Sequence, residues 1–281
     1  MKILVTGSKG MLGRTLARTL PCEGFYGADL PETDILDTAS LERAFDAFRP
    51  DAVVHCAAYT NVDRCESDPE GAFRLNRDGS ANVARACARH SARLVAISTD
   101  YVFSGAPGAP RDEADPPGPA TVYGKSKLAG EQAVLAELPD AAIVRTAWLY
   151  GPGGPSFVHT MAKLGAAEGA PLKVVDDQRG NPTSTAALSK AIAFVLENGM
   201  RGIVHGTCEG VCTWYGFACE IFRLLGLKRG VQPCTTAEFP RPAPRPADSA
   251  LAKNALAARG FRMPDWRDAL KEFLKDEFPR V

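Results

Sequence analysis

The chain has 281 residues, which is enough for one large α/β domain, or a domain and a half, with a substantial buried core. Its 33 lysine and arginine residues balance 33 acidic ones, so no global charge favours a nucleic acid or an anionic membrane as partner. A small anionic substrate would need only a local basic pocket. No apolar run approaches the roughly 20 residues that a membrane span requires.

The cysteines indicate a reduced, cytoplasmic protein. The eight cysteines are scattered without a Cys-x-x-Cys pair, and the chain begins on an apolar strand rather than on a charged and then apolar leader. Cys208 and Cys212 are the closest pair, but there is no second pair and the chain has only four histidines. We therefore expect buried free thiols and no metal site.

In the first half of the chain, short β-rich runs alternate with amphipathic helical ones. Strands are expected at residues 2–6, 25–28, 52–56, 93–98 and 141–146. Helices are expected at residues 11–20, 41–48, 69–90 and 123–138, and further along at 157–168 and 185–198. This alternation is typical of a parallel sheet covered by helices on both faces. It predicts a Rossmann-like, doubly wound α/β domain over residues 1–150, with 172–206 returning to it.

After residue 150 the alternation loosens and proline and glycine become frequent, which predicts a smaller C-terminal substrate-binding lobe made of residues 151–171 and 207–281. Residues 239–246 carry four prolines in eight positions. Such a stiff segment could be a polyproline ligand for a partner or a rigid internal loop. Because helical sequence resumes at residue 251 and again near 266, the internal loop is favoured.

A glycine-rich turn follows the first expected strand. Gly7, Gly10 and Gly13 have the spacing Gly-x-x-Gly-x-x-Gly, and Met11 and Leu12 open the next helix. Glycines let the backbone turn sharply and approach a pyrophosphate, and the free N–H groups of a helix start favour an anion. The same residues could form an ordinary strand-to-helix connection. The strand before and the helix after favour dinucleotide binding.

Two later strand ends carry further candidates for the cofactor site. Asp29 could accept from the adenosine ribose and repel a 2′-phosphate, which favours NADH over NADPH, although it could also cap a turn. Asp34 and Ile35 could reach the adenine edge, or form a turn. Ala57 and Ala58 are small enough to let the nicotinamide ribose and the diphosphate approach, or could pack a helix start.

Tyr123 and Lys127 are four residues apart, so they share one face of the expected helix. A neighbouring ammonium stabilises a phenolate and brings proton transfer nearer the working pH. Thr99 emerges at the carboxyl end of a buried strand, where open α/β sheets bind ligands. Together the three residues suit hydride transfer to a carbonyl, with Thr99 orienting the oxygen and Tyr123 protonating it. Alternatively, Thr99 could cap a loop and Tyr123 could be a surface aromatic.

The order of these motifs resembles the extended short-chain dehydrogenase/reductase superfamily and, within it, the dTDP-4-dehydrorhamnose reductase family. The resemblance rests on the glycine turn, on Ser-Thr-Asp-Tyr-Val-Phe at 98–103 and on Tyr-Gly-x-Ser-Lys-x-x-Gly-Glu at 123–131. Further matching blocks lie at 61–66, 145–151 and 177–183. The likeness runs from Met1 to about Asp265.

The resemblance implies NADPH or NADH as cofactor and a nucleotide-sugar as substrate. It implies that Thr99, Tyr123 and Lys127 are catalytic, that the three glycines hold the diphosphate, and that Asp34, Ile35, Ala57, Ala58 and Tyr59 line the cofactor. The resemblance also implies that the substrate is contacted by Thr99, Asp100, Tyr101, Trp148 and Arg245.

Some implications stay open. Trp148 could equally be a core residue. Residues 244–249 read Pro-Arg-Pro-Ala-Asp-Ser, where relatives commonly have two arginines and an asparagine, so the sugar or nucleotide preference is open. The family includes metal-bridged dimers; their acidic ligands have no match here, but the chain could form a homodimer.

Three functions compete. The first is reduction of the 4-keto group of dTDP-4-dehydro-L-rhamnose to dTDP-L-rhamnose. The second is a non-catalytic regulatory subunit that binds a dinucleotide, like the regulatory subunit of methionine adenosyltransferase; the retained threonine, tyrosine and lysine speak against it. The third is a nucleotide-sugar epimerase or dehydratase, which the block at 98–103 disfavours because those enzymes usually read Ser-Ser there.

Overall fold

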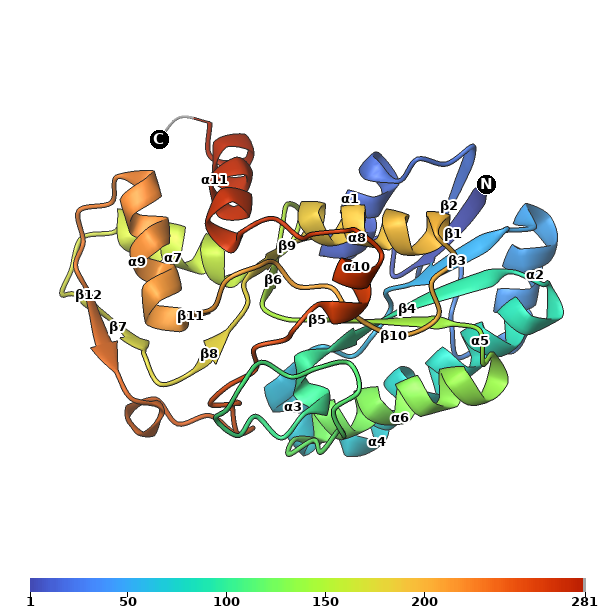
Figure 1. The fold of residues 1–281 in the computed structure, drawn as a ribbon, viewed down its shortest axis with the longest axis horizontal. Helices are drawn as coiled ribbons and strands as arrows, with labels where there is room; N and C mark the ends of the chain where they lie inside the picture. The colour runs from blue at the N-terminus through green and yellow to red at the C-terminus, as the bar shows by residue number, and fades with distance from the viewer. Residues whose placement is uncertain (280–281) are drawn as a thin grey trace.

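A six-stranded parallel sheet organises the first part of the molecule, which we describe for residues 1–279 of a computed structural model (Figure 1). Its order is β10-β5-β4-β3-β1-β2, and every neighbouring pair is parallel. The strands are β1 (Lys2–Thr6), β2 (Gly24–Ala28), β3 (Ala52–His55), β4 (Arg93–Thr99), β5 (Ala142–Thr146) and β10 (Gly202–His205). Runs such as residues 52–55 are buried on both faces, which is why they are apolar almost throughout.

Helices cover both faces of this sheet, as predicted. Figure 1 shows α1 (Met11–Thr19) and α8 (Thr185–Glu197) on one face, with α2 (Thr38–Phe48), α5 (Ser80–Arg89) and α6 (Val122–Glu137) on the other. Leu16 and Ile192 belong to the core under the first pair, whereas Phe45 and Val134 belong to the core under the second group. The fold is therefore a doubly wound α/β arrangement.

The strand order places a switch point beside β1. The chain leaves β1 for β2 on one side and then crosses to β3 on the other side. Open α/β sheets bind ligands at such a point, outside the carboxyl ends of the strands. The glycine turn after β1 and the alanines after β3 meet there.

The helix predicted over residues 69–90 is interrupted. It consists of α4 (Pro69–Phe73), a π-helical stretch (Arg74–Gly79) and α5. A β-carbon on Gly130 of α6 would lie 2.2 Å from the Asn76 carbonyl oxygen, so α6 packs directly on the wide π turn. The residue pattern does not reveal this interruption, because a π turn adds one residue and the helical periodicity continues on either side of it.

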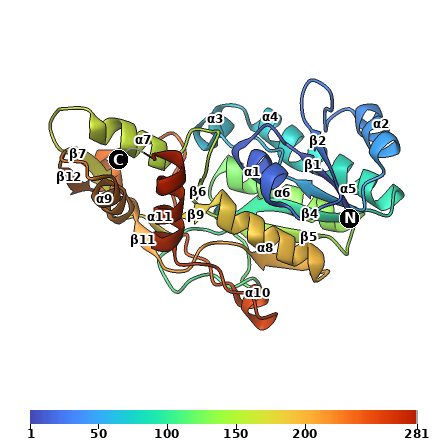
Figure 2. The same cartoon turned by 90° about the horizontal axis from the view of Figure 1, so that it is seen from above.

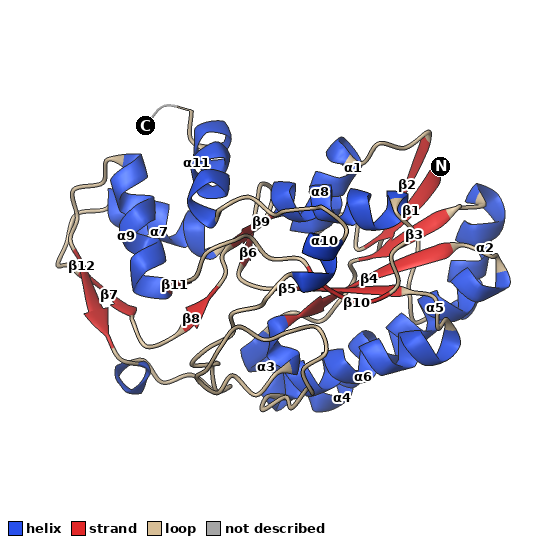
Figure 3. Ribbon diagram, in the orientation of Figure 1, coloured by secondary structure: helices blue, strands red, loops and turns tan. Residues whose placement is uncertain are grey.

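The second part of the molecule is built from small elements, seen on the left of Figures 1 and 3. Its strands pair two by two: β6 (Leu149–Tyr150) with β9 (Thr183–Ser184), β7 (Leu172–Val175) with β12 (Val231–Cys234), and β8 (Arg179–Gly180) with β11 (Cys212–Thr213). Its helices are α7 (Phe157–Ala166), α9 (Trp214–Leu225) and α11 (Trp266–Glu277), whereas α10 (Asn254–Ala258) lies against β10 of the main sheet. Fully buried Phe217, Ile221 and Trp266 form part of the core here.

The chain passes between the two parts more than once. Of the range 172–206, α8 and β10 lie at the main sheet, whereas β7 pairs with β12 in the second part. Figure 2 shows α8 beside α1, with α7, α9 and α11 together at the other end of the molecule. Three short elements complete the chain, namely α3 (Val62–Ser67) and single 3-10 turns at Asp100–Val102 and Thr236–Glu238.

The proline-rich residues 239–246 pack against the chain itself. Ala243 is fully buried, and the Asp248 amide just beyond donates to the Gly105 carbonyl at 3.0 Å. The segment is thus an internal loop that joins the second part to the start of the β4–α6 connection. Within residues 1–279, all eight cysteines are unpaired, no helix is long and apolar enough to cross a bilayer, and no His, Cys, Asp or Glu cluster could hold a metal ion.

Candidate active site

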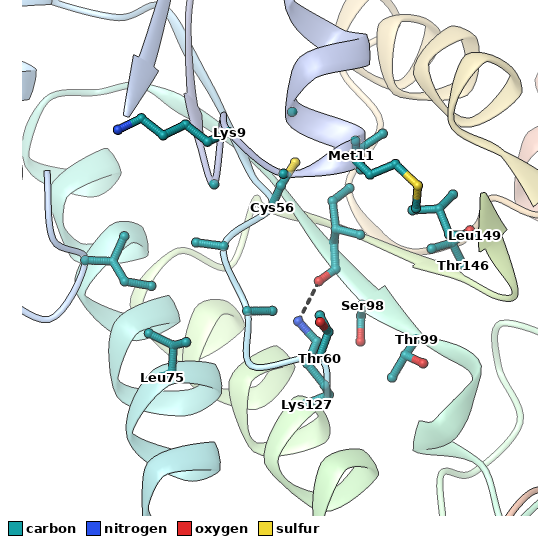
Figure 4. Close-up of a pocket in the computed structure, with 18 of the residues that line it drawn as sticks. Lys9, Met11, Cys56, Thr60, Leu75, Ser98, Thr99, Lys127, Thr146 and Leu149 are labelled. Atoms are coloured by element: carbon teal, nitrogen blue, oxygen red, sulfur yellow. Dashed lines mark hydrogen bonds between the residues drawn. The ribbon is translucent and has the colours of Figure 1, made fainter. Parts of the chain in front are cut away.

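A cavity of about 740 Å³ lies along the carboxyl ends of β1, β3, β4 and β5. Figure 4 shows Lys9 and Met11 toward one end and Ser98, Thr99 and Lys127 toward the other. Sixteen of the eighteen residues predicted for the site line this cavity: Gly7, Gly10, Met11, Leu12, Gly13, Asp29, Asp34, Ile35, Ala57, Ala58, Thr99, Asp100, Tyr101, Tyr123, Lys127 and Trp148. The sheet therefore gathers residues that are up to 141 positions apart, from Gly7 to Trp148, around one hollow.

The glycine turn leaves no room for side chains. Gly7 has a φ of 67°, and a β-carbon there would lie 2.7 Å from the Ala57 amide nitrogen. A β-carbon on Gly13 would lie 2.4 Å from the Gly7 carbonyl oxygen. Gly10, the residue before helix α1, provides no side-chain cap, so the first N–H groups of the helix are available at the cavity. This bare backbone cradle fits a pyrophosphate.

The rim beside β2 carries both signs of charge. The Asp29 carboxylate accepts from the Lys9 and Leu30 amides at 2.8 and 2.9 Å. The Lys9 ammonium donates to the Leu30 carbonyl and lies 3.1 Å from a Glu32 carboxylate oxygen. A carboxylate suits ribose hydroxyls and an ammonium suits a 2′-phosphate, so this rim fits either NADH or NADPH. The sequence analysis missed Lys9, although its place inside the glycine turn was a signal.

At the end of β4 a threonine and a buried carboxyl group face the cavity. The Thr99 hydroxyl donates to one Asp100 oxygen at 2.9 Å and accepts from the Tyr101 amide at 3.2 Å. The other Asp100 oxygen, Oδ2, has no partner among the described residues. Burial raises the pKa of Asp100 to about 6, although the nearby Ser249 and Thr99 hydroxyls oppose the rise.

Tyr123 lies in the first turn of α6, which begins after the Thr121 cap accepts from the Gly124 amide at 3.0 Å. Its ring meets Tyr101 edge-on, with centroids 5.5 Å apart. Burial raises the pKa of Tyr123 well above its ordinary value, and hydrogen bonding with Thr99 only partly opposes this. The expectation that Lys127 stabilises the phenolate is therefore wrong for the cofactor-free protein, because desolvation dominates.

Lys127 points from the next turn of α6 to the sheet. Its ammonium donates to the Ile97 carbonyl at 2.8 Å, the dashed line in Figure 4. Burial lowers the pKa of Lys127 to about 8, while Glu131 opposes the change. The ammonium is thus the charged form near neutral pH, and it is fixed at the floor of the cavity.

Two predicted residues do not line this cavity. The Tyr59 backbone hydrogen-bonds the Asn76 side chain in both directions, and its hydroxyl donates to Asp68 at 3.2 Å. Arg245 lines a separate hollow of about 310 Å³ next to Tyr101, and its guanidinium forms a two-point ion pair with Asp63 at 2.9 Å for both contacts.

Trp148 lies at the border between the two parts of the molecule. It has a φ of 47°, and its indole stacks on that of Trp214 with centroids 3.5 Å apart and planes 5° apart. It is half-buried, lines the cavity and packs against the main core, so its surroundings suit both a substrate contact and a core residue. Trp214, at the start of α9, was not predicted; α9 itself was absent from the expected elements.

The cavity also contains residues that the sequence analysis left out. Leu75 comes from the π-helical stretch, Cys56 and Thr60 from the loop after β3, and Thr146 and Leu149 from the end of β5 and from β6. The remaining ones are Leu30, Thr33, Val62, Ile97, Ser98, Ala147 and Ala28. Most lie in the last residues of a strand or in the loop after it, which was a usable signal; Leu75 had none.

Comparisons with known proteins agree with this geometry. The family model described as RmlD substrate binding domain matches residues 1–278. A dTDP-4-dehydrorhamnose reductase from Streptomyces griseus is 46% identical over 96% of this chain and 91% of the relative. A probable dTDP-4,6-dihydroxy-2-methyloxan-3-one 4-ketoreductase from Streptomyces antibioticus is 44% identical over 98% and 95%. The dTDP-4-dehydrorhamnose reductase of Bacillus anthracis, solved in complex with NADP, superposes with a TM-score of 0.95 at 39% identity, covering 98% of this chain and 100% of that one.

Proposed function

The chain belongs to the dTDP-4-dehydrorhamnose reductase family, and on this premise we propose that it reduces the 4-keto group of dTDP-4-dehydro-L-rhamnose to a hydroxyl group, giving dTDP-L-rhamnose, with NADPH or NADH as cofactor. One observation carries the proposal. Thr99, Tyr123 and Lys127 meet at one end of a cavity whose other end is a bare glycine cradle for a dinucleotide.

The protein's own contribution to the reaction is a proton and its placement. A bound reduced nicotinamide supplies the hydride that reaches the carbonyl carbon. Thr99 orients the carbonyl oxygen, and the Tyr123 hydroxyl gives its proton to that oxygen as it gains negative charge. The raised pKa of Tyr123 keeps the phenol protonated until this moment, and the alkoxide is the stronger base. Lys127 holds the ribose hydroxyls and places a positive charge beside the transfer.

The substrate side of the cavity supports a nucleotide-sugar. Tyr101 and Trp148 present aromatic surfaces that can cover a sugar or stack on a base. Asp100, beside Thr99, can bond a sugar hydroxyl. Arg245 lies in the hollow next to Tyr101 and is paired with Asp63. If this ion pair rearranged, the Arg245 guanidinium could bind a substrate phosphate.

The test is to mix purified protein with NADPH or NADH and a panel of dTDP-4-keto sugars, including dTDP-4-dehydro-L-rhamnose. We expect a loss of reduced-nicotinamide absorbance that matches the sugar converted, and the largest kcat/KM with dTDP-4-dehydro-L-rhamnose. Conversion without net cofactor oxidation would identify an epimerase or dehydratase. Cofactor binding without conversion of any sugar would identify a regulatory subunit.

The Streptomyces antibioticus relative makes a second substrate worth including. That relative is named for 4-keto reduction of a different dTDP-linked sugar, and residues 244–249 of this chain depart from the common family pattern. A larger kcat/KM with such a sugar would mean that the protein is a 4-keto reductase, as proposed, but that its preferred substrate is a different dTDP-linked sugar.

We also propose that the protein acts in the cytoplasm and forms a homodimer. Eight unpaired cysteines within residues 1–279 support a reducing compartment, and the family resemblance supports the dimer. Light scattering on the purified protein would give the mass directly, and a value near the 30.0 kDa of one chain would reject the dimer.

A further inference from the structure

A buried ion pair lies beneath the catalytic end of the cavity. Arg145 of β5 donates through Nε and Nη2 to the two Glu131 oxygens of α6, at 2.9 and 2.7 Å. Both side chains are 4% exposed. The Ser98 hydroxyl of β4 also donates to Glu131, and the Phe103 ring covers the Arg145 guanidinium at 5.0 Å. Neither charged residue was among the predicted site residues.

This pair lies one helical turn from the catalytic lysine. Positions 123, 127 and 131 of α6 are spaced by four and share one face of the helix. Residues at the end of β4 face them: the Ile97 carbonyl accepts from Lys127, Ser98 donates to Glu131, and Thr99 lines the same cavity as Tyr123. Strand β4 therefore holds α6 in place through direct hydrogen bonds to Lys127 and Glu131.

Stability alone is a poor explanation for such a pair. Removing two charges from water costs several kcal/mol per ion, and apolar residues of similar volume often serve a core as well or better. The pair would be explained if the negative charge of its Glu131 carboxylate keeps a neighbouring cation charged. Lys127 is such a neighbour, because it is 6% exposed and burial favours its neutral form.

Three other titratable groups near Lys127 within residues 1–279, His55, Cys56 and Tyr123, carry no negative charge near neutral pH. On β3, burial lowers the pKa of His55 to about 3 and raises that of Cys56 to about 12. On α6, burial keeps Tyr123 protonated. Asp100 at the end of β4, with a pKa of about 6, is ionised near neutral pH, but its charge raises the pKa of Tyr123 and is not among the causes that shift the pKa of Lys127. Glu131 is left as the carboxylate that opposes the loss of charge at Lys127.

We propose that Glu131, itself held by Arg145 and Ser98, is a positioning residue for the reaction: one helical turn beyond Lys127 on the same face of α6, its carboxylate keeps that ammonium charged while the Ile97 carbonyl holds it at the end of β4. Arg145 clamps the carboxylate in place and prevents it from being protonated. The inference rests on the proposed function for its catalytic consequence, but not for its effect on Lys127.

The experiment follows the titration of Lys127 in the cofactor-free protein by NMR of isotope-labelled lysine side chains, with the Lys127→Arg variant to assign the signal. In Glu131→Gln, which keeps the shape and loses the charge, we expect the titration midpoint to fall by roughly one pH unit or more. The alkaline fall in kcat should move with it. An unchanged midpoint in a folded Gln variant would overturn the proposal, whatever the substrate proves to be.

Glu137→Gln is the matched control, because it breaks an arginine pair on the same helix, with Arg85, that is exposed to solvent. It should leave the Lys127 midpoint in place, and an equal fall in this variant would also overturn the proposal. If Glu131→Gln fails to fold, Glu131→Asp is measured instead. The shorter side chain draws the carboxylate back from Lys127, so a smaller fall is expected and an unchanged midpoint rejects the role.

Discussion

The two sides of the proposed active site, the main cavity and the hollow next to Tyr101, are held by different kinds of contact. On the chemical side, β4 and α6 are joined by polar side chains that are at most 6% exposed, among them Ser98, Thr99 and Lys127. On the substrate side, the loop of residues 239–246 is largely exposed and is tied down by the half-buried pair of Arg245 and Asp63. The reacting groups are therefore fixed by the sheet, whereas the contacts over the substrate are ones that a ligand could replace.

The largest effect is expected from Tyr123→Phe on the chemical side. The ring stays and keeps its contact with Tyr101, but the proton donor is lost. We expect kcat to fall by about 10²–10⁴-fold while cofactor affinity stays unchanged. Single-turnover kinetics and a fluorescence titration with NADPH would measure the two quantities.

Tyr215→Phe, on α9 away from the cavity, is the control for loss of a tyrosine hydroxyl and should keep wild-type turnover. Near-wild-type turnover in Tyr123→Phe would remove Tyr123 from the mechanism. It would also erase the contrast between a chemical side and a substrate side.

The second effect concerns the cofactor cradle. In Gly13→Ala the new methyl group would meet backbone atoms of Gly7 and Ser8 at 2.4–2.8 Å, so the turn must open. We expect the dissociation constant for NADPH to rise by roughly 10–100-fold, as for an overpacked site that costs 1–3 kcal/mol. Gly10→Ala is the graded control, because its methyl group would lie 3.2 Å from the Gly7 carbonyl oxygen and should weaken binding less. Equal affinities in both variants would show that the turn is not a tight cradle.

The parts of the fold and of the site that could be predicted from the sequence are those that a local pattern of residues determines. The main strands, the glycine turn and the Tyr-x-x-x-Lys pair are local patterns, and fifteen of the sixteen correctly placed lining residues precede position 128. Trp214, Leu75 and Arg145 depend on tertiary contacts: an indole stacked from another part of the chain, a π turn, and a guanidinium paired across β5 and α6. The pKa of Tyr123 was misjudged for the same reason, since helical spacing reports a neighbour and not the degree of burial.

The third effect belongs to the substrate side. Arg245→Gln should raise KM for the sugar nucleotide by roughly tenfold, as expected for one lost charge-assisted contact, with kcat little changed. Asp63→Asn separates two explanations. If Arg245 leaves Asp63 to bind the substrate, Asp63→Asn should leave KM unchanged or lower it. If the pair is a strut for the loop, both variants should raise KM alike, and Arg245 is then no substrate ligand.

The smallest effect compares two carboxyl groups, one from each side, through thermal unfolding. Asp100 on the chemical side has a folded-state pKa of about 6, above its ordinary value near 3.8, so its ionisation opposes folding, and its contribution to stability falls as pH rises between about 4 and 6. Asp100→Asn should therefore raise Tm above pH 6, by about 2–4 °C for each kcal/mol relieved, and lose this advantage below pH 4.

Asp63 on the substrate side should behave in the opposite way. Burial acts to raise its pKa, but the hydrogen bonds from Arg245 and the Ala243 amide outweigh this and lower it. Its ionised form thus supports folding above about pH 4, and this support is lost as pH falls through the lowered pKa. Asp63→Asn should lower Tm at neutral pH and approach the wild type in acid. Differential scanning calorimetry from pH 3 to 8 would show opposite signs for the two variants at neutral pH, because desolvation prevails at Asp100, whereas at Asp63 the hydrogen bonds and charge of its partners together outweigh desolvation. A shift of the same sign in both would mean that the two sides are held by the same balance of forces.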